Sequence, residues 1–278
     1  SLVLLTEKAG GQVMVFKTDK TAALVKRFGE MKRPNAVAIV PKVKVGKKKL
    51  DLAFVTERDG NLVSVYSIPD FAKVGEFAHE VSQPMGISLY RNKNEFFAYV
   101  VAKRAAENDK VIRFKITEKD GKVIGVEDLK FGKELTPNQE TVFVDDKRKL
   151  VFVADETAQN IKVYDLNGNW QKTFGDGAFQ AQVEGITIAR CRKTDFLIAS
   201  DQRDTTEFEI FDLKDFQHLG TVITTANRTD GIALTQTKLK DFPNGLFISQ
   251  SDPDGTGGRQ AEFFDFKVFL AKANLKCR

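Results

Sequence analysis

The segment Glu184-Gly185-Ile186-Thr187-Ile188 decides the fold, because variants of it recur along the chain. Most of the variants begin with a polar residue and continue as a short apolar strand. They are Asn35-Ala36-Val37-Ala38-Ile39, Met85-Gly86-Ile87-Ser88-Leu89, Glu140-Thr141-Val142-Phe143-Val144 and Asp230-Gly231-Ile232-Ala233-Leu234. The five segments start at residues 35, 85, 140, 184 and 230, and are therefore 50, 55, 44 and 46 residues apart. A period of this length indicates a fold built from similar units.

Two further strands follow each of these segments. The second strand is apolar and ends on polar residues, in Leu52 to Arg58, Phe97 to Lys103, Leu150 to Glu156, Phe196 to Gln202 and Leu246 to Asp252. The third strand alternates, in Val63 to Tyr66, Val111 to Phe114, Ile161 to Tyr164, Phe208 to Phe211 and Phe263 to Phe266. Turn residues such as Asp59-Gly60-Asn61 and Asn167-Gly168-Asn169 separate the strands. This pattern is typical of consecutive β-hairpins.

Units of roughly 45 residues with several antiparallel strands are the signature of a β-propeller. We therefore expect an all-β, six-bladed β-propeller that forms a single domain over residues 1–278, with the 23 Phe residues packed between blades. A β-sandwich, the alternative fold, does not predict a repeat of this length. Only Val268 to Leu275 has an apolar spacing that suits a helix.

The first blade is expected to lack its innermost strand. Leu2 to Lys8 matches the second strand of a unit and Gln12 to Phe16 matches the third. An absent inner strand would leave backbone N–H and C=O groups unpaired beside the channel. We therefore expect a segment before Ser1, or an N-terminal peptide partner, to complete this blade.

The composition and charge of the chain limit the classes of partner that it is expected to bind. The chain is 42% hydrophobic and 29% charged, its apolar runs are shorter than a membrane-spanning helix needs, and its net charge is only +5. Its densest basic run, Lys42 to Lys49, has no interleaved aromatic residues and suits a solvated hairpin. No nucleic-acid or membrane partner is therefore expected. Cys191 and Cys277 allow one disulfide or two free thiols, and His79 and His218 have no zinc-ligand spacing with them.

Charged residues recur where the strands meet one mouth of the expected channel. The starts of the inner strands supply Glu140, Glu184 and Asp230, and the ends of the second strands supply Lys8, Arg58, Lys103, Asp155, Glu156, Gln202 and Asp252. Converging carboxylates repel one another unless cations neutralise them, and hard oxygen ligands suit Ca²⁺. The lysines and the arginine offer the opposite charge, which a phosphate-bearing substrate requires.

At this point the chain resembles a known family, the β-propeller phytases, over Leu2 to about Phe266. These are calcium-dependent phosphatases of inositol hexakisphosphate. The most specific likeness lies in Thr229-Asp230-Gly231-Ile232 followed by Phe242-Pro243-Asn244-Gly245-Leu246-Phe247-Ile248-Ser249-Gln250. Val183 to Ile188 is similar to the preceding blade of the family, and Met85 to Tyr90 to an earlier one.

The resemblance implies an enzyme that hydrolyses phosphomonoesters of phytate with several Ca²⁺ ions and an attacking water. It implies metal ligands at Glu140, Glu156, Glu184 and Asp230, and substrate contacts from Lys8, Arg58 and Lys103. It further implies that Glu140, Glu184, Lys103 and Arg58 act in catalysis. No covalent enzyme intermediate is implied.

Several positions depart from the family pattern. Ala9 stands where a second lysine is usual, Met85 where a tyrosine is usual, and Ser251 where an aspartate is usual. These departures favour an alternative function, a phytase-like propeller that binds calcium, anions or a protein without turnover. A sugar-lactone hydrolase on a related propeller would need an amide-rich ligand set, which Asn35 and Gln202 alone do not supply. Asp252 to Gly255 is expected to form a plain turn rather than a calcium loop.

The resemblance also bears on the compartment. The family is largely secreted, and free cytosolic calcium is too low to fill oxygen sites of moderate affinity. An extracellular location is therefore expected, and Cys191 and Cys277, which fall in adjacent blades, could be bridged there.

Overall fold

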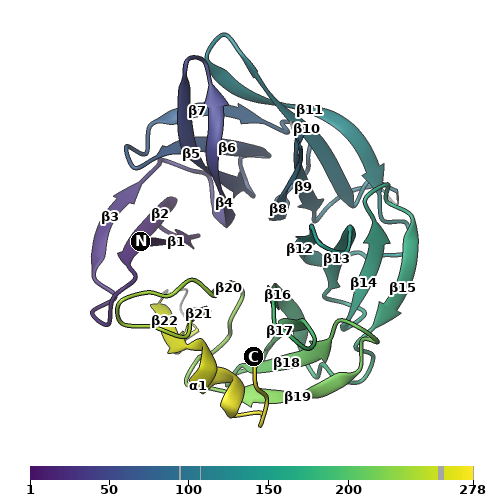
Figure 1. Cartoon of the computed structure of the whole chain (residues 1–278). Coiled ribbons are helices and arrows are strands. Elements are labelled where there is room, and N and C mark those ends of the chain that lie inside the picture. Colours follow the sequence, from purple (N-terminus) through teal and green to yellow (C-terminus); the bar gives the residue numbers. More distant parts are fainter. Residues whose placement is uncertain (94, 107, 256–259, 278) are drawn as a thin grey trace.

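The computed structural model describes residues 1–93, 95–106, 108–255 and 260–277. Antiparallel sheets of short strands account for most of these residues, together with one short helix. The sheets stand in a ring, with the first strand of each four-stranded unit nearest to the centre (Figure 1). The all-β prediction is therefore confirmed. No helix of the described part is both long and apolar enough to cross a membrane.

The sheets follow one another along the chain, and most strands pair with their sequence neighbours. The first sheet contains β1 (Leu2–Glu7), β2 (Gln12–Lys17) and β3 (Leu24–Phe28). Eight strands follow: β4 (Pro34–Val45), β5 (Lys48–Glu57), β6 (Leu62–Ile68), β7 (Lys73–Phe77), β8 (Pro84–Asn92), β9 (Glu95–Ala102), β10 (Val111–Lys119) and β11 (Lys122–Phe131). Next come β12 (Gln139–Asp145), β13 (Leu150–Asp155), β14 (Asn160–Asp165) and β15 (Trp170–Phe174). They are followed by β16 (Gln182–Ala189), β17 (Phe196–Gln202), β18 (Glu207–Asp212) and β19 (His218–Ile223). The last sheet contains β20 (Ile232–Thr235), β21 (Leu246–Ser251) and β22 (Gln260–Asp265), and the helix α1 (Phe266–Ala271) follows it.

The strands β4 to β11 form two four-stranded meanders that share one sheet. The outer strands β7 and β11 meet in a single parallel pairing of Gly75 with Val123. A Cβ atom on Gly75 would clash with the backbone carbonyl of Val123. Glycine at this position therefore permits the two meanders to join.

The basic run of the second unit forms the solvated hairpin that its composition predicts. Strand β4 ends at Val45, which pairs with Lys48 at the start of β5. Gly46 adopts a left-handed conformation in the turn, with φ of 58°. Asp252 to Gly255 likewise forms a turn, in which the Gly255 amide donates to the carbonyl of Asp252.

Aromatic side chains fill the spaces between neighbouring sheets, as the abundance of phenylalanine predicts. Phe174 of β15 packs edge-on against Phe211 of β18, with ring centroids 5.1 Å apart. Phe208 of β18 packs against Phe247 of β21 at 5.2 Å. Such aromatic pairs bury large apolar areas and favour this tilted geometry. The core is therefore divided into clusters that join each sheet to the next.

The helix α1 covers the last sheet. Asp265 caps it by accepting hydrogen bonds from the backbone of Lys267 and Val268, and Phe269 packs on Phe247 with centroids 4.0 Å apart. The helix begins two residues before the predicted segment and ends at Ala271. The chain then turns at Asn274, which has a φ of 58°, and the Leu275 amide donates to the carbonyl of Leu270 at 3.1 Å.

Candidate functional site

Four inner strands carry an irregularity near their starts. The register between the first and second strand of a sheet shifts between Pro34 and Val37, Pro84 and Ile87, Gln139 and Val142, and Val183 and Ile186. A β-bulge of this kind re-aims the side chains at the shift. Each shift displaces two residues of the inner strand. Glu140 is one of them in β12, and Glu184 is one of them in β16. Asp230 precedes β20 at the corresponding position.

The same positions bring neighbouring inner strands close together. A Cβ atom on Gly86 would lie 2.6 Å from the carbonyl oxygen of Glu140, and one on Gly185 would lie 2.8 Å from the backbone nitrogen of Ile232. Only glycine permits this approach, since real Cβ atoms do not make such contacts. The backbone segments that carry Glu140, Glu184 and Asp230 therefore lie next to one another.

Three glutamates form the centre of the site. Carboxylate oxygens of Glu140, Glu156 and Glu184 lie within 4.8 Å of one another. Lys103, which follows β9, bonds to Glu140 at 2.5 Å and to Glu156 at 3.3 Å. Gln182 donates a hydrogen bond of 2.7 Å to Glu156. This arrangement concentrates negative charge around a single lysine.

Asp230 forms the second part of the site. Its carboxylate pairs with Lys8, which follows β1, at 2.6 Å, and accepts a hydrogen bond from the Gln202 side-chain amide. Its backbone N–H donates to the side-chain carbonyl of Gln250 at 2.7 Å. The structure therefore brings together six predicted residues, which are Lys8, Lys103, Glu140, Glu156, Glu184 and Asp230.

The electrostatics of the centre are unfavourable without a further cation. Burial raises the pKa of the Glu140 carboxyl to about 7, although Lys103 opposes the shift. Burial, followed by repulsion from Glu140 and Asp230, raises the pKa of Glu184 well above its ordinary value. The Glu184 side chain has no hydrogen bond or ion pair among the described residues. A buried carboxylate without a partner is costly, so the site favours an added positive charge.

Polar atoms without partners also gather at this end of the strands. Each atom is fully buried and has no hydrogen-bond partner among the described residues. The residues that carry them include Asn35, Arg58, Gln83, Gln139, Thr229, Ser249 and Gln250. Buried polar groups in folded proteins are normally bonded to protein, water or ligand. Their accumulation here fits a bound hydrated ion or polar ligand, and the carboxylate oxygens suit Ca²⁺.

Among the predicted catalytic, substrate-binding and metal-binding residues that the structure describes, Arg58 alone makes no contact with the carboxylates. It follows β5, its backbone N–H donates to the carbonyl of Arg33, and its Nε is among the partnerless atoms. Asp155 also ends a second strand but belongs to a turn instead, where it accepts hydrogen bonds from the side chain and backbone of Thr136. The ends of the second strands therefore do not all contribute to one site.

Two acidic features were not predicted. Glu57 is buried and accepts hydrogen bonds from the backbone of Lys32 at 2.9 Å and from Ser64 at 2.5 Å. A second carboxylate cluster contains Asp201, Glu207 and Glu209. The alternation of Glu207 and Glu209 with apolar residues on β18 is its only sequence signal.

The carboxylates of the second cluster already have partners within the protein. Asp201 accepts two backbone hydrogen bonds, from Gln180 at 2.9 Å and Ala181 at 2.8 Å. Glu207 pairs with Arg203, and Glu209 is bonded to His218. The second cluster therefore lacks a buried carboxylate without a partner, which is the feature that distinguishes the first cluster.

Comparison with known proteins assigns neither a family nor a function to the chain. A scan against models of protein families gave no match for the chain, and a search of curated proteins found no significant similarity. The function must therefore be inferred from the geometry of the site.

Proposed function

We propose that the protein is a calcium-dependent phosphomonoester hydrolase that acts on inositol hexakisphosphate. The observation that carries this proposal is the group of Glu140, Glu156 and Glu184 with Lys103 in contact, where Glu184 is buried without a partner. Convergent carboxylates suit several calcium ions, and adjacent cations suit a substrate that carries many phosphates.

We further propose that the ring of sheets is a six-bladed β-propeller. Each half of the eight-stranded sheet would be one blade, as would each of the other four sheets. Support comes from the repeated meanders, which stand in a ring (Figure 1), and from the packing of aromatic residues between neighbouring sheets. The site would then lie at one mouth of the central channel.

The lysines would have two roles in this mechanism. Lys103 bonds to Glu140 and Glu156, and Lys8 bonds to Asp230, so both ammonium groups now balance carboxylates. Once the carboxylates held calcium, Lys103 and Lys8 would turn to the substrate phosphate. Arg58 would join them through its guanidinium group, whose Nε has no partner among the described residues. Glu140, Glu156, Glu184 and Asp230 would hold the ions, and Glu140 and Glu184 would thereby position the reacting phosphate.

Calcium, when bound, would supply positive charge for phosphate oxygens and favour deprotonation of a water that attacks phosphorus. The chain's own contribution is to keep the four carboxylates close together and to stabilise charge on the transferring group through Lys103 and Arg58.

The calcium requirement also suggests an extracellular protein. Oxygen sites of moderate affinity are filled at extracellular calcium concentrations. The disulfide between Cys191 and Cys277 supports this proposal, because such bonds persist in oxidising compartments.

The test is phosphate release from inositol hexakisphosphate with millimolar calcium and with a chelator. We expect release only with calcium, and a loss of at least about 100-fold in Glu184→Gln and Lys103→Gln. Matched controls are Glu80→Gln and Lys115→Gln, which change exposed residues outside the site. Equal release with the chelator would overturn the calcium dependence.

A second candidate function is a module that binds calcium or anions, or a protein, without turnover. Met85 is 1% exposed and lies in the apolar core, and Ser251 accepts a backbone hydrogen bond from Asn227. Neither position offers a group to the substrate. Calcium-dependent thermal stabilisation without any phosphate release would favour this function over hydrolysis.

A further inference from the structure

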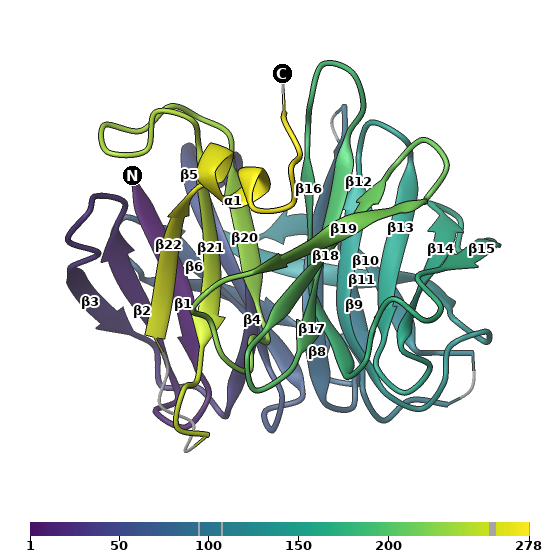
Figure 2. The ribbon, with the colours of Figure 1, turned by 90° about the horizontal axis from the view of Figure 1, so that it is seen from below.

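A cleft of about 550 Å³ lies at the opposite end of the strands from the carboxylates. The helix α1, the C-terminal segment and the loop between β20 and β21 enclose it, and Figure 2 shows these three parts together at one end of the ring. Glu184 stands at the start of β16 and Cys191 follows its end. A strand of eight residues spans about 26 Å, so this cleft is distinct from the candidate metal site.

The cleft has an apolar interior and a basic rim. Pro243, Ala271 and Leu275 provide apolar surface beside the buried Phe266 and Leu270, and Lys238, Lys267 and Lys276 line the cleft as well. All three lysines are exposed. A volume of this size is within the usual range for small-molecule sites, which combine apolar walls with a few polar groups.

The positive charge of the cleft is not balanced locally. Among the described residues, none of the three lysine ammonium groups has an ion pair, and no Asp or Glu lines the cleft. Asp265 lies nearby in sequence, but its carboxylate caps α1 and accepts hydrogen bonds from Asn244. An anionic group at the rim would therefore meet uncompensated lysine charge.

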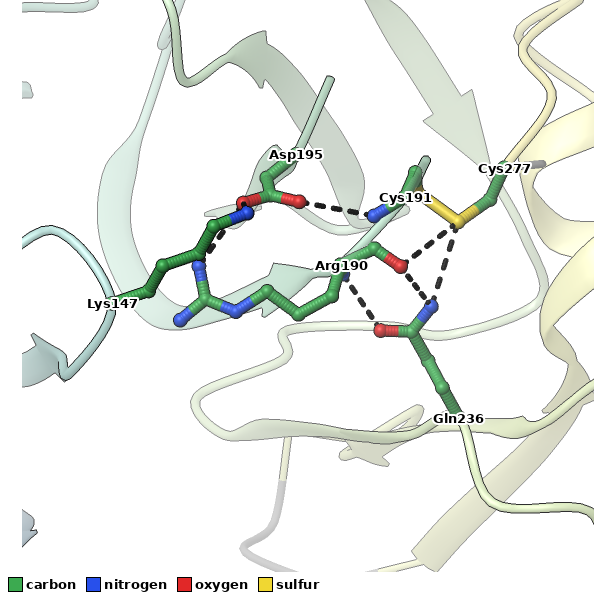
Figure 3. Close-up of a disulfide and its surroundings, with 6 residues drawn as sticks. All are labelled: Lys147, Arg190, Cys191, Asp195, Gln236 and Cys277. Atoms are coloured by element: carbon green, nitrogen blue, oxygen red, sulfur yellow. Dashed lines mark hydrogen bonds and ion pairs between the residues drawn. A yellow bond between two sulfur atoms is a disulfide. The ribbon is translucent and has the colours of Figure 1, made fainter. Parts of the chain in front are cut away.

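The wall that carries Lys276 is held in place. Cys277 forms a disulfide with Cys191, which lies in the turn between β16 and β17 (Figure 3). Gln236, on the facing loop, accepts a hydrogen bond from the backbone N–H of Arg190 at 2.7 Å and donates one to its carbonyl at 2.8 Å. These ties pre-form the cleft, and a pre-formed site binds with less loss of conformational entropy.

We propose that this cleft binds a small amphipathic anion, in which an apolar chain bears one carboxylate. The chain would lie on Pro243, Ala271 and Leu275, and the carboxylate would meet the lysines of the rim. Neither element alone is sufficient, because an exposed lysine pair contributes little energy and a free anion gains nothing from the apolar wall. This inference is independent of the proposed hydrolysis.

Decanoate is the probe, and its binding is followed by changes in the amide NMR spectrum of the intact oxidised protein. We expect saturable shifts confined to residues of the cleft. Decanol, which has the same chain without charge, and inorganic phosphate, which has charge without the chain, are expected to bind at least about tenfold more weakly.

Variants test the two recognition elements separately. The triple variant Lys238→Gln, Lys267→Gln and Lys276→Gln is expected to weaken decanoate binding by roughly tenfold. Ala271 is an exposed residue that lines the cleft, so Ala271→Trp should fill the cleft and abolish binding. Lys240→Gln is the matched control, since Lys240 is exposed on the same loop but does not line the cleft.

Three results would overturn the proposal: shifts scattered over the surface, equal binding of decanol, or full binding by the Ala271→Trp variant. The double variant Cys191→Ser and Cys277→Ser is expected to bind decanoate several-fold more weakly while keeping the dispersed spectrum of a folded protein. Unchanged affinity in that variant would show that the disulfide does not pre-form the site.

Discussion

Glu184 combines burial, nearby carboxylates and the lack of a protein partner. We expect Glu184→Gln to raise the free energy of unfolding without calcium by about 1 kcal/mol, because one repelling charge is removed. In the unchanged protein, millimolar calcium over a micromolar site should add about 4 kcal/mol. The variant should lose most of that gain. Thermal unfolding with calcium and with a chelator measures both effects.

The control for Glu184 is Glu80→Gln, which removes the same charge from an exposed position. It should keep the full calcium gain. If both variants respond to calcium like the parent protein, the three-glutamate centre is not the metal site.

Asp195 gives a prediction for pH. Its side chain is 2% exposed and accepts hydrogen bonds from Lys147 at 2.9 Å, Arg148 at 2.8 Å and the Cys191 backbone at 3.0 Å. Burial would raise the pKa of Asp195, but these bonds outweigh it and hold the pKa well below its ordinary value. Such a carboxyl stabilises the fold above the unfolded pKa of about 4, and this stabilisation is lost as the pH falls further.

Asp195→Asn should therefore lower the free energy of unfolding by about 2 kcal/mol at pH 7. The difference from the parent protein should shrink as the pH falls below about 4. Urea unfolding at pH 7, 5 and 3 measures it. A difference that stays constant down to pH 3 would mean that the carboxylate charge is not responsible.

The recurrence of charged residues was sufficient to predict most of the candidate site. Glu140, Glu184 and Asp230 occupy one repeated position, and the bulge there directs Glu140 and Glu184 to the same end. The sequence did not show which of Asp155 and Glu156 faces the site. Adjacent residues of a strand face opposite sides, so only one of the two can do so. The role of Gln182 was not predicted, because its bond to Glu156 crosses between sheets.

The inner strands offer a test at the level of secondary-structure elements. Gly86→Ala and Gly185→Ala should each destabilise the protein by about 1–3 kcal/mol, because the added methyl group meets the backbone of the next inner strand. Gly231→Ala is the matched control from the same repeated motif. Nothing lies within 4 Å of its added Cβ, so stability should change by less than about 1 kcal/mol.

Urea unfolding midpoints of the three variants provide the comparison. Equal destabilisation at all three positions would mean that backbone conformation, rather than contact between inner strands, requires the glycine.

The inner, second and third strands of the units were predictable, and the outer strands were not. The predicted strands have apolar runs or strict alternation, which follow from burial on one or both faces. Outer strands such as β3 and β15 are only five residues long and mostly exposed, so they carry a weak pattern. Their formation depends on pairing with the third strand of the same sheet.

The disulfide acts on the whole molecule. It closes a loop of 86 residues and ties the C-terminal segment to the turn between β16 and β17. A cross-link over such a loop restricts the unfolded chain, and its removal typically costs about 2–5 kcal/mol. We expect Cys191→Ser with Cys277→Ser to lower the free energy of unfolding within that range.

Urea unfolding of the double variant, beside the oxidised and the reduced parent protein, measures this contribution. The reduced parent should match the variant. A variant as stable as the oxidised parent would show that the last sheet and α1 are held by packing alone.

The ring arrangement followed from the period of the repeat, but the join between β7 and β11 did not. It rests on one pairing, Gly75 with Val123, between outer strands of neighbouring units. Contacts of this kind depend on how far each sheet tilts, and no local residue pattern encodes that tilt. The disulfide was only one of two alternatives, because the sequence does not give the distance between Cys191 and Cys277.

The two candidate sites lie at opposite ends of the strands, with the glutamates around Glu184 at one end and the lysines around α1 at the other. A ligand bound in the cleft beside α1 would therefore leave the carboxylate end open to solution, and both sites would accept their ligands at the same time.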